Sequence, residues 1–511
     1  MLEPIDILLN KFTMYKLTLY YLILLVVVAI FFSFFGFLSY KPLDITINTL
    51  IVLGVSISAN YLFAKIFRAV TNVESVFITA LILVLIVPIG FPQNTFFLIF
   101  ASLIAMAAKY LLTVEKRHLF NPAAVSVVAI SLISNNSATW WVGTPVMLPF
   151  ILLGGLLLIR KIRREIMIVN FLGAYLLLIT LGAIFHTGSF VSVFSTWKLS
   201  LFHSALFFFA FVMLTEPLTS PATKKLQIFY SYVVAFFYAT VQLRLFGIGF
   251  TPEMALCFGN VFSYFSSPNY RLDLALKWKK QLSPDTFAFA FNKSSSFKFI
   301  AGQYMEWTLP HKNTDSRGNR RYFSLASSPT EEEIFLTVKF YNPSSSYKKA
   351  LLNLEEGQKI IASQVAGDFT LPKNINKPLV FIAGGVGIAP FRSIIKDIID
   401  NKLQSDITLF YSNRTADEIL FSDTFQKGEE YGVKTIYTLT DTKNISADWQ
   451  GEKGYITEDL IIQKMPDYML KTYYISGPQL MVQSFEKLLL GMGVKKRKII
   501  TDFFPGYTEN K

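Results

Sequence analysis

The stretch Phe265-Ser-Ser-Pro-Asn-Tyr-Arg-Leu-Asp-Leu-Ala-Leu276 joins two halves of very different composition. Upstream, nearly every window of about 20 residues is apolar, which is long enough to cross a bilayer as a helix. Downstream, short alternating apolar runs are separated by Asn, Ser, Gly and Pro, as is typical of strands and turns. The stretch therefore predicts a helical membrane part fused to a soluble part.

The composition of the whole chain agrees with this division. We expect three domains, at 1–268, 269–376 and 377–511. Apolar residues make up 52% of the chain and Phe occurs 49 times, far above a soluble average. The net charge of +13 does not indicate nucleic-acid binding, because much of it lies in short loops between apolar runs. The single cysteine, Cys257, excludes an intrachain disulfide and a four-thiolate iron–sulfur cluster, and we expect no metal site.

Ten apolar runs in the first half are candidates for membrane-spanning helices. The fifth run, from Pro122 to Ser134, is short and is expected to be tilted or re-entrant. No cleavable signal is expected, because the first run lacks a small-residue cleavage site. The runs begin near Leu17, Ile45, Val76, Thr95, Pro122, Pro145, Ile166, Leu199, Ile228 and Pro252.

The Lys and Arg residues of the first half lie mainly in alternate loops. Thirteen lie on one side of the predicted helices, and only Lys41, Lys198 and Arg244 lie on the other. Since positive loops stay on the cytoplasmic side, the N-terminus is expected in the cytoplasm. After ten spans the soluble half is expected there too. The sequence thus predicts a multi-pass protein of the inner (cytoplasmic) membrane, surrounded by lipid.

Four polar residues interrupt the apolar runs, where they are costly in lipid. Asn121 lies in Phe120-Asn-Pro-Ala-Ala124, and Glu216 lies in a Thr-Glu-Pro segment that closes the eighth run. Glu253 and Asn260 lie in the tenth run. Taken singly, each reads more simply as a helix cap or breaker at the water interface.

In this order the segments resemble the membrane flavoprotein subunits Rnf D and Nqr B. The resemblance covers about residues 15–268 and is carried by Phe120 to Ala123, Leu158-Ile-Arg-Lys161, Phe207 to Pro221 with Glu216 in place of Asp, and Glu253 with Asn260. It implies a flavin between the helices.

One departure bears on how that flavin is held. The family esterifies FMN to a Thr in a Ser-x-Ala-Thr loop, whereas here the nearest string, Asn136-Ser-Ala-Thr139, has its Ser one place too late. Thr139 is therefore more simply an ordinary loop residue, and noncovalent FMN or riboflavin is expected. Haem is a competing cofactor. Of His118, His186 and His203, only the last two could hold one outer haem, and a two-haem relay is excluded.

The second half predicts a small antiparallel barrel followed by a parallel β/α sheet. Barrel strands are expected at 273–278, 286–291 and 334–340. From Lys377 a strand at 378–383 precedes a helix at 390–399, and further strands are expected at 407–411 and 473–476.

The order of signals over about residues 270–507 resembles the ferredoxin–NADP reductase superfamily, in which a flavin barrel precedes a pyridine-nucleotide domain. Arg321-Tyr-Phe-Ser324 corresponds to its Arg-x-Tyr-Ser pattern. The resemblance implies that Arg321 binds the FAD pyrophosphate, for which a bidentate guanidinium is suited. It also implies that Phe323 packs on the flavin ring and that the Ser324 hydroxyl meets the hydride-accepting nitrogen. Tyr322 should point to the other strand face.

Three further segments are implied to contact FAD. Phe299-Ile-Ala-Gly-Gln-Tyr304 matches the strand before the flavin, and Gly367-Asp-Phe369 matches the turn near the adenine. Asn342-Pro-Ser-Ser-Ser-Tyr-Lys-Lys349, with Ser346 and Lys348, is expected to offer backbone amides to the pyrophosphate.

Two glycine-containing motifs indicate a nicotinamide dinucleotide. Gly384-Gly-Val-Gly-Ile-Ala-Pro390 lies between a strand and a helix, where glycines permit close approach to a pyrophosphate and Pro390 suits the first helical turn. Alone this motif is weak evidence, but a second one, Ser476-Gly-Pro-Gln-Leu-Met481, follows another strand, and the pair is strong evidence. The resemblance implies that Ser476 lies beside the nicotinamide. The remaining implied binding residues are Gly384, Gly385, Gly387, Pro390, Gly477, Pro478 and Met481.

The C-terminal segment and one arginine complete the candidate site. Phe504, or else Phe503, falls where the family places an aromatic over the flavin, with a hydrophobic plug as the alternative. Arg414 could clamp the 2′-phosphate of NADPH. Asp417 and Glu418 would repel that phosphate, so NADH is favoured over NADPH.

Together the sequence predicts an NAD(P)H-dependent flavin oxidoreductase of the membrane that passes electrons through FAD. Its acceptor is expected to be quinone, a second flavin or an extracytoplasmic acceptor. Two alternatives stay open at this point: a reductase tethered by an anchor or transport domain, and a haem-containing ferric-reductase-like protein.

Overall fold

The computed structural model of the chain describes residues 3–10, 12–67, 73–114, 117–134, 136–187, 190–243, 250–266, 271–315, 317–372, 374–375 and 377–504. The chain forms two compact units, Met1–Asn269 and Tyr270–Lys511, here called unit 1 and unit 2.

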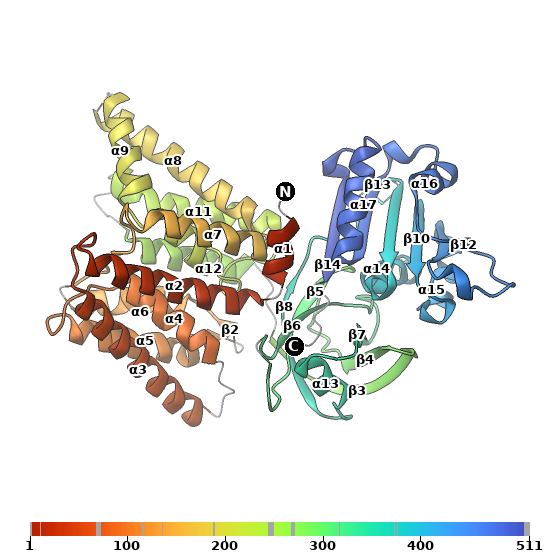
Figure 1. The fold of residues 1–511 in the computed structure, drawn as a ribbon, viewed down its shortest axis with the longest axis horizontal. Coiled ribbons are helices and arrows are strands. Elements are labelled where there is room, and N and C mark those ends of the chain that lie inside the picture. The colour runs from red at the N-terminus through yellow and green to blue at the C-terminus, as the bar shows by residue number, and fades with distance from the viewer. Residues whose placement is uncertain are drawn as a thin grey trace. The chain divides into compact units, whose positions relative to one another are not determined.

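Unit 1 is built from helices, with one short hairpin, β1 (Thr113–Val114) and β2 (Arg117–His118) (Figure 1). Each of the ten apolar runs contains helix. The helices are α1 (Glu3–Asn10), α2 (Met14–Phe34), α3 (Pro42–Ile66), α4 (Val73–Ile86), α5 (Thr95–Leu111), α6 (Pro122–Ile133), α7 (Leu148–Ile162), α8 (Glu165–Thr187), α9 (Phe190–Phe202), α10 (Leu206–Phe208), the π-helix η1 (Phe209–Met213), α11 (Lys224–Leu243) and α12 (Pro252–Ser266).

Three of the described helices, α2, α3 and most of α8, are long and apolar enough to cross a membrane, or four if a bent pair counts as one span. The bent pair corrects one expectation: the eighth run is not one helix, because α9 and α10–η1 meet at 57°. At the break the Ser204 hydroxyl donates to the Ser200 carbonyl (2.5 Å) and accepts from the Leu206 N–H (3.2 Å), in place of regular helical bonds. Ten spans remain a prediction.

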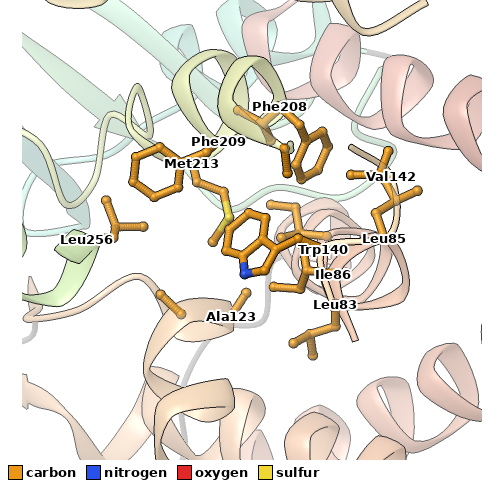
Figure 2. Packing of buried hydrophobic residues seen from close by; sticks show 14 of the residues in the cluster. Leu83, Leu85, Ile86, Ala123, Trp140, Val142, Phe208, Phe209, Met213 and Leu256 are labelled. Carbon is orange, nitrogen blue, oxygen red and sulfur yellow. The ribbon is translucent and has the colours of Figure 1, made fainter. Parts of the chain in front are cut away.

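The core of unit 1 gathers around Trp140, which follows α6 in the chain. Figure 2 shows its indole among side chains that include Ala123, Phe209, Met213 and Leu256, and its ring lies 5.9 Å from that of Phe209. These neighbours come from α6, η1 and α12. Trp140 therefore packs among residues of three helical segments that are far apart in the sequence.

Unit 2 contains two six-stranded sheets. The first is antiparallel, in the order β6-β5-β8-β3-β4-β7. Its apolar face packs with α13 (Ser346–Leu352) into one core that includes Trp307 and Tyr347. The strands are β3 (Arg271–Ser283), β4 (Thr286–Asn292), β5 (Tyr304–Thr308), β6 (Arg320–Ser324), β7 (Glu333–Lys339) and β8 (Lys359–Ala366).

The second sheet is parallel, in the order β12-β11-β10-β9-β13-β14 (Figure 1). The predicted order in this half, an antiparallel sheet followed by a parallel β/α sheet, is thereby confirmed. Its elements are β9 (Leu379–Gly384), α14 (Ala389–Asp400), β10 (Ile407–Asn413), α15 (Ser422–Gly428), β11 (Val433–Leu439), β12 (Glu452–Lys453), α16 (Glu458–Lys464), β13 (Thr472–Pro478), α17 (Gln479–Gly491) and β14 (Ile499–Phe504).

Helix α14 fastens the first sheet of unit 2 to the second. The Ser393 hydroxyl donates to the Ser327 carbonyl (2.6 Å), and Arg392 donates to the Ala326 carbonyl (3.1 Å) and pairs with Glu331. Ala326 and Ser327 follow directly on β6. The end of β6 is therefore held against the helix that starts at the Gly384–Pro390 motif.

One predicted strand of unit 2 is wrong in extent. Of the stretch 299–304, only Tyr304 belongs to a strand, and the residues before it form a turn closed by the Gln303 N–H on the Ile300 carbonyl (3.1 Å). Gly302 has φ +92°, and a Cβ there would lie 2.0 Å from the Phe369 carbonyl oxygen. The close approach of two backbones imposes the turn.

Candidate functional site

The two glycine motifs of unit 2 lie against each other at one end of the parallel sheet. Strands β9 and β13 are neighbours, with Ala383 opposite Ser476. A Cβ on Gly387 would lie 2.5 Å from both the Gly477 Cα and the Ser476 carbonyl oxygen. The motifs therefore meet backbone to backbone, and only glycine fits at position 387.

Met481 closes the same edge from the start of α17. A Cβ on Gly384 would lie 2.1 Å from the Met481 sulfur, and one on Gly477 would lie 3.1 Å from it. Gly385 differs, because it has φ +52° and open space where a Cβ would be. Pro390 lies in the first turn of α14, as predicted. The edge is thus tightly packed at Gly384 and Gly477, against the Met481 side chain, and has open room at Gly385.

The Ser476 side chain is fully buried at this edge. Among the described residues its hydroxyl has no hydrogen-bond partner. An unsatisfied buried hydroxyl costs free energy, so it is a group that a ligand can satisfy. The Ser476 hydroxyl is therefore suited to contact a bound nucleotide. Pro478, two residues further on, is exposed.

Strand β6 presents Arg321 and Phe323 on one face. Both contact Tyr347 of α13: the guanidinium lies 5.0 Å from the ring centre, and the Phe323 ring lies 6.0 Å from it. Tyr322 points to the other face, as predicted, where its hydroxyl donates to Glu306 (2.8 Å). Tyr347 is fully buried beneath Arg321. It lies in the segment 342–349 that was expected to face the pyrophosphate, but no sequence pattern indicated its packing against Arg321.

Arg321 is held by its own hairpin. Its Nη1 donates to the carbonyls of Arg317 (2.9 Å), Gly318 (3.1 Å) and Arg320 (2.6 Å), and its Nη2 lies 3.6 Å from Asp315. Arg317 is itself buried to 4% exposure. Asp315 and Arg317 were also missed, since a charged turn before a strand reads as a solvent loop.

Ser324 ends β6 opposite Tyr304 of β5. Its side chain is buried, and among the described residues its hydroxyl has no hydrogen-bond partner. Gly367, at φ +111°, lies against the Tyr304 ring, where a Cβ would approach to 3.1 Å. Phe369 is instead packed in the core, with ring centres 5.3 Å from Phe391 and 5.2 Å from Tyr474. The structure thus groups Tyr304, Ser324 and Gly367, and it buries Phe369.

Two other predicted FAD contacts lie on α13. The Ser346 N–H donates to Asp315 (3.1 Å), and the Lys348 ammonium donates to the Lys339 carbonyl and lies over the Tyr341 ring. Burial, with a further contribution from the Arg321 charge, lowers the pKa of Lys348 to about 8. A nearby anion such as a phosphate would stabilise the charged form of this buried lysine.

Arg414 follows β10 and is exposed. Its Nε lies 3.9 Å from Asp441, which follows β11. Asp441 was missed by sequence reasoning. The side chains of Phe503 and Phe504 lie outside the described residues, although β14 pairs with β13.

In unit 1, three of the four predicted polar residues form one cluster. The Asn121 N–H donates to the Asn260 side-chain oxygen (2.8 Å), and the Asn121 side-chain amide donates to Glu216 (2.9 Å). Thr219 also donates to Glu216 (2.8 Å), and Asn260 donates to the Tyr230 hydroxyl (3.3 Å). Segments far apart in sequence therefore meet in a connected polar network.

The fourth residue, Glu253, is buried and accepts a bond from Trp140 (2.9 Å). None of the hydrogen bonds described for Glu253 joins it to the cluster of Asn121. Thr139 is exposed beside Trp140, and His186 and His203 are exposed.

A cavity of about 60 Å³ adjoins the cluster. Its walls combine apolar side chains with the polar groups of Asn121 and Glu216. This space holds a few water molecules but not a flavin ring. The other lining residues include Ser75, Ile78, Leu158 and Val212.

Comparison with known proteins identifies part of unit 2. Residues 381–487 match the family described as "Oxidoreductase NAD-binding domain". The chain therefore carries such a domain, and the predicted class, a flavin oxidoreductase that uses NAD(P)H and FAD, is confirmed for this unit.

Three curated relatives show the extent of the similarity. NADH-cytochrome b5 reductase 1 of Ajellomyces capsulatus is 30% identical over 209 residues, which is 39% of this chain and 66% of that protein. The F component of the Na(+)-translocating NADH-quinone reductase of Methylococcus capsulatus is 30% identical over 36% of this chain and 49% of that protein. A probable flavin reductase of Aliivibrio fischeri is 25% identical over 41% of this chain and 88% of that protein.

The chain spans between about half and two thirds of the length of the first relatives it matches, 52%, 66%, 49% and 53%. Among solved structures, the flavohem-like FAD/NAD-binding domain of nitric oxide dioxygenase from Vibrio cholerae is 24% identical, with a TM-score of 0.40. The match covers 45% of this chain and 98% of that chain.

Proposed function

We propose that the chain is a membrane-bound dehydrogenase that takes hydride from NADH or NADPH onto FAD in unit 2. Electrons then pass to an acceptor in or across the membrane through unit 1. One observation carries the proposal: the reductase unit belongs to the same chain as a helical unit whose apolar side chains face outward. In unit 1, Phe185 is 87% exposed and Phe190 is 84% exposed, whereas Asn48 and Ser56 are buried. Such an arrangement suits lipid surroundings.

The residues of unit 2 fit FAD and a nicotinamide dinucleotide. Buried hydroxyls without described partners lie at Ser324 and Ser476, and Gly385 leaves open space beside the backbone, where a pyrophosphate could approach. We assign the FAD pyrophosphate to Arg321, Ser346 and Lys348 and the flavin ring to Phe323 and Tyr304. We assign the nicotinamide to Ser476, Gly477, Pro478 and Met481, and we assign Phe504 to the face of the flavin ring.

FAD, when bound, accepts a hydride and releases electrons singly. The chain's own contribution is to bind and orient the two nucleotides. Ser324 would donate its hydroxyl to the flavin, and Ser476 would help to position the nicotinamide. Both side chains are small and buried, so they hold the reacting groups close while excluding water.

For unit 1 we propose the relationship to Rnf D and Nqr B, with ten spans and a cytoplasmic N-terminus and reductase. The support is that Asn121, Glu216 and Asn260, which the resemblance singles out, form one network. A flavin ring does not fit the adjoining cavity, so no step is assigned to a second flavin. Quinone near the inner face is the acceptor we propose.

A different role for unit 1 is a membrane anchor or transport body that merely tethers the reductase. The satisfied network at Asn121 is compatible with this, because capping and bridging alone stabilise helices. Glu216→Gln separates the two roles: transfer to quinone survives it if unit 1 is an anchor.

The proposed function is tested on the purified full-length protein in detergent. We expect an oxidised flavin spectrum that NADH bleaches without oxygen, and one FAD per chain on extraction. A colourless protein indifferent to NADH and NADPH would overturn the proposal. A Soret band would instead support haem at His186 and His203.

A further inference from the structure

The carboxylate of Asp315 joins two groups that we assign to the FAD pyrophosphate. One oxygen lies 3.6 Å from Arg321 Nη2, and the other accepts the Ser346 N–H (3.1 Å). The first oxygen also accepts the Arg317 N–H (3.0 Å). A carboxylate with these partners makes the same kind of contacts as a phosphate oxygen pair.

The surroundings of Asp315 are strongly positive. Arg317 and Arg321 are buried, and Lys348 lies close enough that both arginines lower its pKa. Burial raises the pKa of Asp315, but the Arg317 N–H and the Arg321 charge together bring it below its ordinary value. Asp315 is therefore an anion at neutral pH, and its single charge offsets only part of the cationic cluster.

Arg321 does not depend on Asp315 for its position. Its Nη1 is held by three backbone carbonyls, and its guanidinium rests over the buried Tyr347 ring. Removing the charge at 315 should therefore leave Arg321 in place while taking away one anionic partner of its Nη2.

We infer that Asp315 is an internal competitor for the FAD pyrophosphate, which must displace its carboxylate from Arg321 and Ser346. This rests on the proposed function. The carboxylate stabilises the unit without FAD and lowers its affinity for FAD, so that the cofactor is bound less tightly than the cationic cluster alone would allow.

The test is a titration of flavin-free full-length protein with FAD, followed by fluorescence. Asp315→Asn retains an oxygen for the Arg317 N–H and loses the charge. We expect it to bind FAD roughly fivefold more tightly, the size typical of removing one partly exposed ion pair. Its thermal midpoint without FAD should fall. Riboflavin, which lacks the pyrophosphate, should bind both proteins equally.

Glu333→Gln is the matched control, since it removes one negative charge from β7, in the same sheet as Arg321, and from a carboxylate paired with Lys277 (2.6 Å). It should leave FAD affinity unchanged. Asp315→Ser, whose hydroxyl can also accept the Arg317 N–H, is the second variant and should tighten binding in the same way if Asp315→Asn does not fold.

The outcomes are distinguishable. Weaker or unchanged FAD binding by both Asp315 variants, with the wild type binding normally, overturns the inference alone. Equal tightening by Glu333→Gln also overturns it, because the effect would then follow from the loss of any negative charge from this sheet. Failure of the wild-type protein to bind FAD at all overturns the proposed function, and the inference with it.

Discussion

The candidate groups of unit 1 and those of unit 2 differ in how they are satisfied. In unit 1, Asn121, Glu216 and Asn260 bond to one another across three segments. In unit 2, the buried hydroxyls of Ser324 and Ser476 have no partner in the described part of the chain. A closed network contributes to stability by itself, whereas open groups gain only when a ligand arrives. Buried polar side chains therefore stabilise unit 1 through one another, whereas in unit 2 they are left for a ligand to satisfy.

The largest expected effect is in the closed network. Asn121→Ala removes the cap on α6, where the side chain accepts the Ala124 N–H (3.0 Å), and one of the bonds to Glu216. We expect a loss of roughly 2–4 kcal/mol in the free energy of unfolding. Thermal unfolding in detergent measures it, with Asn136→Ala in an exposed loop as the control. Equal midpoints for both variants would show that the network is not closed.

The next effect concerns the contact between the glycine motifs. Gly387→Ala pushes a methyl group into the backbone of Ser476 and Gly477. Adding volume to a packed place costs about 1–3 kcal/mol, so NADH affinity should fall by roughly 5- to 150-fold. Gly385→Ala meets open space, and its only strain comes from φ +52°. If the two variants bind NADH equally well, the backbone contact does not shape the nucleotide site.

The open hydroxyls give a smaller effect of a different kind. Ser324→Ala and Ser476→Ala should leave the thermal midpoint of the flavin-free protein unchanged, because no described bond is lost. Each should slow flavin reduction by NADH by up to about tenfold, the worth of one hydrogen bond. Stopped-flow absorbance measures the rate. A clear fall in the thermal midpoint of either variant would show that its serine hydroxyl stabilises the protein without a ligand, as the groups of the closed network do.

The smallest effect is a pH dependence. Burial lowers the pKa of Lys348 from 10.5 to about 8, so folded unit 2 releases this proton before the unfolded chain does. The Lys348 contribution to stability therefore rises with pH between about 8 and 10.5. FAD affinity should fall by at most about fivefold between pH 8 and pH 9, since the pyrophosphate favours the charged lysine. Lys348→Met should abolish both trends, and if it alters neither, Lys348 does not face the pyrophosphate.

The sequence predicted unit 2 better than unit 1 for physical reasons. Its glycine motifs and strand alternation are local patterns, so the parallel sheet and the opposite orientation of Tyr322 followed from spacing. Asp315, Arg317 and Tyr347 could not be predicted, because their roles depend on how one hairpin meets α13. In unit 1, apolar runs mark helices but say little about breaks. The 57° bend near Ser204 depends on side-chain bonds that composition does not reveal.

The central claim is that electrons enter through FAD in unit 2 and leave through unit 1. Its most direct test is reoxidation of the NADH-reduced protein by quinone in lipid nanodiscs without oxygen, comparing the wild type with Glu216→Gln. We predict rapid reoxidation of the wild type, slow reoxidation of the variant, and equal rates with ferricyanide, which reaches the reductase from water. Equal quinone rates for folded wild type and variant would contradict the account and leave unit 1 as an anchor.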